Sequence, residues 1–125
     1  MPAAFGGKID YGPVGSHILA FQFTNAKLSE RPVARTANSF AYPGATPSIS
    51  SDGSLNPILW AVENASPAVL YAYDATTLIQ IYNSNQAAGG RDHFGSGNKF
   101  ITPTVANGRV YVGTATGVGV FGLLK

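Results

Sequence analysis

Short apolar runs, separated every few positions by glycine, proline or small polar residues, set the pattern of this chain. The runs are rich in Val, Ile, Leu, Tyr and Phe, the composition of β-strands, and they are too short to predict helices. A helix over Leu55–Leu70 is the one rival interpretation, but Pro57 and Pro67 would interrupt it. The pattern therefore predicts an all-β fold.

The predicted strands follow the apolar runs, and turn residues lie between them. Pro32 makes the third strand an edge strand, because proline cannot donate to a ladder. Asn107-Gly108 predicts a tight hairpin, since both central residues of such a turn need positive φ. A polar, glycine-rich loop is expected over Asn83–Asn98. The strands are expected at Lys8–Val14, His17–Phe23, Arg31–Thr36, Thr46–Ser50, Ile58–Glu63, Ala68–Tyr73, Leu78–Tyr82, Phe100–Val105, Arg109–Thr114 and Gly117–Leu123.

An internal repeat narrows the choice among β architectures. The pair Thr46-Pro47 returns as Thr102-Pro103, 56 residues later, and two apolar strands follow each copy. Ile9–Gly12 and His17–Phe21 look like the second and third strands of an earlier copy. Repeats of about 40–50 residues with four strands are typical of propeller blades. We therefore expect one β domain over 1–125, made of antiparallel four-stranded blades: part of a blade at 5–36, a full blade at 40–85 and part of a blade at 98–125, about 2.5 in all.

Three segments carry a resemblance to a known family: VLYAYDATTL, GATPSISSDG and GNKFITPTVANGRVYVGTATGVGVFGLL. They resemble the PQQ-repeat β-propellers, bacterial proteins with quinoprotein-like blades, in which a Gly-x-Val-Tyr-Val-Gly-Thr strand recurs. Asn107–Thr114 matches that strand. The likeness covers residues 40–125 well and 5–36 loosely, and it is closest to the carboxyl-terminal blades of a longer protein. It implies an exported protein, extracellular or periplasmic, although Met1–Ala4 shows no signal peptide.

Composition limits the classes of function. Hydrophobic residues make up 45% of the chain and charged residues 11%, against about 25% charged in ordinary soluble domains. Disorder is therefore not expected, and no apolar run approaches the roughly 18 residues of a membrane-spanning helix. The net charge of +2 is too small for a nucleic-acid-binding surface. The absence of cysteine excludes disulfides, thiolate zinc sites and a cysteine nucleophile.

The strongest candidate for chemistry lies in the long loop. Arg91, Asp92 and His93 could perform acid–base work, bind a metal weakly or hold an anion. The alternative is that Arg91 and Asp92 pair with each other in a turn. As an enzyme, the chain would be a small hydrolase or a metal-dependent enzyme that uses Asp92 and His93; otherwise these three residues are the predicted ligand-binding residues.

Other motifs predict structural roles. Gly117–Gly122 fits the dinucleotide fingerprint, yet the chain ends at Lys125, too soon for the helix that would hold a pyrophosphate. Trp60 lies in an apolar strand and is expected to pack between blades, so we expect no quinone cofactor despite the resemblance. His17 is expected to be structural. A mixed metal site that uses Asp10, Glu63, Asp74 or Asp92 has no ligand spacing, and no metal or other cofactor is expected.

Incomplete blades leave apolar faces and strand edges without neighbours. The sequence therefore predicts a non-catalytic propeller-type binding or scaffold module that associates with itself through blade edges into a homo-oligomer. A glycan or a protein is the expected further ligand, because Trp60 and five of the six tyrosines supply aromatic surface: Tyr42, Tyr71, Tyr73, Tyr82 and Tyr111. A carbohydrate-binding module and the small enzyme described above are the alternatives. Neither nucleic-acid binding nor insertion into a membrane is expected.

Overall fold

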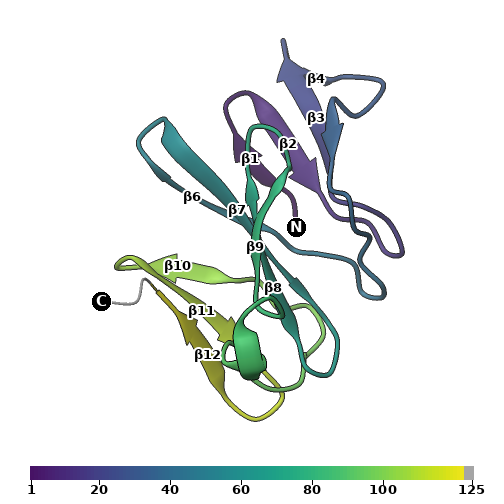
Figure 1. Cartoon of the computed structure of the whole chain (residues 1–125). Helices are drawn as coiled ribbons and strands as arrows, with labels where there is room; N and C mark the ends of the chain where they lie inside the picture. Colours follow the sequence, from purple (N-terminus) through teal and green to yellow (C-terminus); the bar gives the residue numbers. More distant parts are fainter. Residues whose placement is uncertain (123–125) are drawn as a thin grey trace.

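The computed structural model describes residues 1–122, and these form three antiparallel β-sheets in chain order (Figure 1). The only helical segment in this part of the chain is a short 3₁₀ turn, η1 (Ala88–Gly90). The prediction of an all-β, antiparallel fold is confirmed. No helix within residues 1–122 has the length and apolar character needed to cross a membrane.

The first sheet has the strand order β1-β2-β3-β4, and β5 also pairs with β3. Its strands are β1 (Ala3–Phe5), β2 (Lys8–Tyr11), β3 (Leu19–Thr24), β4 (Lys27–Leu28) and β5 (Ala34–Arg35). No strand was predicted before Lys8, but Gly6 and Gly7 take φ of 56° and 73° and close a hairpin between β1 and β2. The strand predicted over Arg31–Thr36 shortens to β5.

The middle sheet is a meander of four strands in the order β6-β7-β8-β9. Its strands are β6 (Ser48–Asp52), β7 (Leu55–Glu63), β8 (Val69–Asp74) and β9 (Gln80–Asn83). Leu55–Leu70 is therefore not a helix. Pro57 lies within β7, and Pro67 lies in the loop before β8.

The last sheet has three strands, β10 (Thr104–Ala106), β11 (Arg109–Gly113) and β12 (Val118–Phe121). Asn107 and Gly108 join β10 to β11 with φ of 50° and 69°, as the hairpin prediction requires. The predicted last strand extended to Leu123, which lies outside the described residues.

The sheets are stacked so that the middle sheet is covered on both faces. Leu59, Ala61 and Tyr73 pack against Ile18 and Ala20 of the first sheet. Because successive strand residues point to opposite faces, the other face of the middle sheet carries Val62 and Leu70. These two side chains pack against Val110 and Val112 of the last sheet. The molecule therefore has two apolar layers, one on each side of the middle sheet.

Two segments connect successive sheets, and these crossovers make equivalent hydrogen bonds. From the first sheet to the middle one, Phe40 donates its N–H to Ser16 and Ala45 donates to Gly12, at 2.8 and 3.0 Å. From the middle sheet to the last, Gly97 donates to Ala65 at 2.8 Å, and Ala68 donates to Gly95 at the same distance. Each crossover is thus hydrogen-bonded to the loop between the second and third strands of the sheet that it leaves.

Candidate functional site

The predicted loop residues Arg91 and Asp92 form an ion pair. Arg91 Nε donates to Asp92 Oδ1 at 2.8 Å, and Arg91 Nη2 donates to Asp92 Oδ2 at 3.2 Å. The hydroxyl of Tyr82, at the end of β9, also donates to Asp92 Oδ2, at 2.6 Å. Both carboxylate oxygens are therefore occupied by neighbours from the loop and the adjoining strand.

These contacts fix the charge of Asp92. The hydrogen bond from Arg91, followed by that from Tyr82, lowers the pKa of the Asp92 carboxyl to about 2. Burial and the bond to Asp92 raise the pKa of the Tyr82 hydroxyl. Asp92 is therefore a carboxylate and Tyr82 a phenol at neutral pH, and neither group is near the pKa that suits acid–base catalysis there. The pairing of Arg91 with Asp92 that the sequence left open is present.

His93 follows on the same loop and is exposed. Its backbone N–H donates to Gly90 at 3.0 Å, and its ring lies against Gly90. Among the described residues no hydrogen bond joins the His93 ring to Asp92. The assignment of Arg91, Asp92 and His93 as ligand-binding residues stays a prediction, and so does the enzyme that would use Asp92 and His93.

The other candidates have structural partners. Nδ1 of His17 lies 3.1 Å from the carbonyl oxygen of Asn38, so this ring holds the first crossover. Trp60 packs against the apolar layer beside the last sheet, and its Nε1 donates to Ser50 Oγ at 2.9 Å. Within residues 1–122 no three His, Asp or Glu side chains are grouped closely enough to hold a metal ion.

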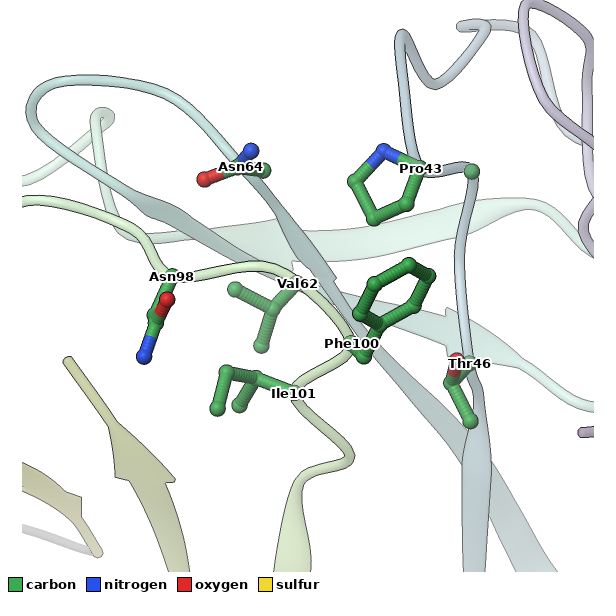
Figure 2. A pocket seen from close by; sticks show the side chains of 8 residues that line it. Pro43, Thr46, Val62, Asn64, Asn98, Phe100 and Ile101 are labelled. Atoms are coloured by element: carbon green, nitrogen blue, oxygen red, sulfur yellow. The ribbon is translucent and has the colours of Figure 1, made fainter. Parts of the chain in front are cut away.

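A hollow that sequence reasoning missed lies where the two crossovers enter the middle and last sheets (Figure 2). It is small, with a volume of about 10 Å³, which is room for about one water molecule, and it is partly open to solvent. Figure 2 shows the ring of Phe100 directed toward Pro43. The lining residues come from the segment before β6, the end of β7 with its following loop, and the segment before β10: Pro43, Gly44, Thr46, Val62, Asn64, Asn98, Phe100 and Ile101.

Two exposed aromatic rings stand at this hollow. Phe100 is 70% exposed and Tyr42, next to the lining residue Pro43, is 55% exposed. Their rings meet edge to face with centroids 6.2 Å apart. The ammonium group of Lys99 lies 5.3 Å from the centroid of the Tyr42 ring, within the range of a cation–π contact.

Phe100 also has an unusual backbone. Its φ is +60°, a left-handed conformation that a bulky residue other than glycine rarely adopts. Such a conformation costs of order 1–3 kcal/mol and persists only where the surrounding structure holds it. Leu78, buried in the core, has a similar φ of +58°.

One signal in the sequence marks this place. Tyr42 and Asn98 each stand four positions before the threonine of a Thr-Pro pair, at Thr46 and Thr102. The repeat therefore puts Tyr42 and Asn98 at equivalent positions, and Phe100 follows Asn98 by two residues. Comparison of the chain with protein-family models, with curated proteins and with solved structures gave no match in any of the three.

Proposed function

We propose that this chain is a non-catalytic, propeller-type binding and scaffold module of an exported bacterial protein, and that it associates with itself. Three antiparallel sheets in succession, of five, four and three strands, support the propeller-blade interpretation that the likeness to PQQ-repeat propellers suggested. The first strands also support it, since β1 lies next to β6 and β6 next to β10. In a propeller the blades surround a central channel, which brings corresponding strands of neighbouring blades together.

Self-association is supported by the exposure of side chains on equivalent faces of the three sheets. In the middle and last sheets, the face toward the preceding sheet carries Ala61, Tyr73 and Val112, all buried. The equivalent face of the first sheet has no sheet before it within the described residues. It carries Tyr11, 49% exposed where its counterpart Ala61 is 0% exposed, and Phe23, 46% exposed.

The face of the last sheet that points away from the middle sheet also carries exposed apolar side chains. Val118 occupies the position of Leu70 in the repeat, but Val118 is 65% exposed where Leu70 is 0% exposed. Val120, on the same face, is 53% exposed, and Tyr111 lies across the ladder from it. One molecule thus has two apolar outer faces, each of the kind that is covered inside the molecule.

A second copy of the chain can bury these two outer faces. Its first sheet presents the face that packs onto a preceding sheet, and its last sheet presents the face that packs onto a following one. Covering apolar surface is favourable by roughly 25 cal/mol per Å² removed from water. This head-to-tail contact closes into a ring if the rotation between copies permits it.

Size-exclusion chromatography with light scattering, at protein concentrations from one to 100 micromolar (roughly the range of transient to stable contacts), tests the proposal. The wild type should give a mass above the 13.0 kDa of one chain. Val120→Lys and Tyr11→Lys, which place a charge on each outer face, should reduce the mass to that of one chain. A wild type of one chain throughout would overturn the proposal.

Ile81→Lys is the matched control. Ile81 is 55% exposed, close to Val120, but it lies in β9, the outermost strand of the middle sheet. This variant should keep the wild-type mass if the outer faces associate. A loss of mass in Ile81→Lys, with none in Val120→Lys, would assign the contact to strand edges and contradict the face-to-face arrangement.

A further inference from the structure

We propose that the outer edge of β12 binds an extended segment of a partner polypeptide, and that this segment places a serine or threonine opposite Val118. The inference goes beyond self-association through sheet faces, because it concerns a strand edge and a different occupant. It rests on the way in which the first two sheets complete the same edge.

In the first two sheets, a buried hydroxyl residue joins the third strand to the segment outside it. Ile18 donates its N–H to Thr36 Oγ1 and accepts the N–H of Thr36, both at 3.0 Å. Leu70 donates its N–H to Ser84 Oγ at 3.1 Å and accepts the N–H of Ser84 at 3.0 Å. Thr36 and Ser84 are both 0% exposed. The two sheets therefore hold their outer segments through the same pair of hydrogen bonds.

In the last sheet the corresponding edge is open. Val118 takes the position of Leu70 and lies opposite Gly113 in the ladder of β11 and β12. Thr114 donates its N–H to Gly117 at 2.8 Å, and hydrogen-bonded pairs alternate with non-bonded pairs in an antiparallel ladder. The N–H and C=O groups of Val118 therefore point away from β11. Within residues 1–122 no strand pairs with β12 on that side.

The open edge lacks the features that usually keep sheet edges from pairing. Charged residues, proline, bulges and very short strands are the common protections. β12 has the sequence Val-Gly-Val-Phe, and its ladder with β11 has no shift in register. By contrast, the ladder that joins β9 to β8 has a register shift, and β4 and β5 have two residues each. Among these outer strands, β12 is therefore the best suited to accept another strand.

The repeat also indicates which side chain stands next to the hydroxyl residue. Tyr82, two residues before Ser84, lies opposite Ala72. The last sheet has Val120 at the position of Ala72, and Val120 is 53% exposed. An aromatic ring opposite a β-branched residue stabilises a strand pair. The expected partner segment therefore has an aromatic residue, any residue, and then serine or threonine, and its main chain supplies the remaining hydrogen bonds.

NMR titration of the ¹⁵N-labelled protein with a synthetic peptide of the sequence Gln80–Gln86 tests this inference. The peptide should shift the amide signals of Val118 and Val120 most. The same peptide with Ser84→Ala should bind about fivefold more weakly, since one neutral hydrogen bond is lost. A peptide methylated on the Ser84 nitrogen should bind about tenfold more weakly or worse, because it cannot donate to the Val118 carbonyl. Equal binding of the three peptides, or largest shifts at Leu70, would overturn the site.

Val118→Pro tests the edge from the side of the protein. Proline is tolerated on an edge strand where the N–H points outward, so this variant should melt close to the wild type. It should bind the serine peptide about fivefold more weakly and no longer distinguish it from the Ser84→Ala peptide. Ile81→Lys changes an exposed residue of β9 and is the control that should bind as the wild type does. If Val118→Pro melts early, the three peptides on the wild-type chain decide the question.

Peptide binding by Tyr11→Lys separates this inference from the proposed function, because Tyr11 lies in the first sheet. A single-chain Tyr11→Lys that binds the peptide would support the edge site independently of assembly. An oligomeric wild type that does not bind the peptide would overturn the edge site alone. A single-chain wild type that binds it would overturn self-association alone. If Val118→Pro reduces the mass to one chain and Tyr11→Lys does not, the edge binds a second copy, which would overturn the partner segment.

Discussion

At the residue scale, some buried polar side chains have hydrogen-bond partners and others have none within the described residues. Thr36 Oγ1 accepts the N–H of Ile18 at 3.0 Å, and Ser84 Oγ accepts that of Leu70 at 3.1 Å. Asp10 is equally buried, yet neither of its carboxylate oxygens has a hydrogen-bond partner within the described residues. Asp10 takes the position that Trp60 has in the middle sheet, so a titratable group lies between two sheets.

We expect this carboxyl to make stability depend on pH. Burial raises the pKa of Asp10 from 3.8 to about 6, against the opposing charge of Lys8. Between these two values the folded chain keeps a proton that the unfolded chain releases, so the free energy of unfolding should fall as pH rises. The fall should total about 3 kcal/mol and level off above pH 6. Urea unfolding at a series of pH values measures it.

Asp10→Asn should remove most of that dependence and raise stability at pH 8, since an amide does not ionise. Asp52→Asn changes an exposed carboxyl and serves as the control. If Asp10→Asn keeps the wild-type slope between pH 4 and 6 (about the interval that the two pKa values span), the titrating group is another residue.

At the scale of single elements, local pattern was enough to predict ten runs that contain strands, which are all the strands except β1 and β4. It was not enough for β1 or β4, because Ala3–Phe5 and Lys27–Leu28 are too short for any periodicity. The hollow escaped prediction for another reason. Its residues come from the end of β7 and from irregular segments far apart in the chain, and the position relative to Thr46 and Thr102 connects Tyr42 with Asn98 only.

The glycines of β12 give a prediction at this scale. A Cβ on Gly119 would lie 2.7 Å from the ring of Phe94, whose own Cβ is 2.9 Å away, so the ring cannot simply turn aside. Gly119→Ala should therefore destabilise the fold by about 1–3 kcal/mol through overpacking. Gly117, two residues earlier, has no neighbour within 4 Å of such a Cβ. Thermal unfolding of Gly117→Ala should match the wild type, and equal losses in both variants would contradict the packing account.

At the scale of the whole molecule, two apolar layers share the middle sheet, and two more apolar faces lie outside. If association covers those faces, folding and assembly are linked, and the melting temperature should rise with protein concentration. Differential scanning calorimetry at concentrations a hundredfold apart (roughly 3 kcal/mol in association free energy) measures this effect. Val120→Lys should melt at one temperature throughout. A concentration dependence that survives in Val120→Lys would place the contact elsewhere.

The path of the crossovers has a consequence for how such a molecule can grow. Each crossover is bonded to the sheet that it leaves, through Ala45 and Gly12 in one case and Gly97 and Ala65 in the other. A unit that starts at one Thr-Pro pair and ends before the next, 56 residues later, therefore contains a sheet together with its own connection. Duplicating that stretch of the gene in frame would add a layer without rewriting the contacts inside any existing one. The number of layers could therefore change in one genetic step, and concatenating copies of this stretch in an engineered gene would test it.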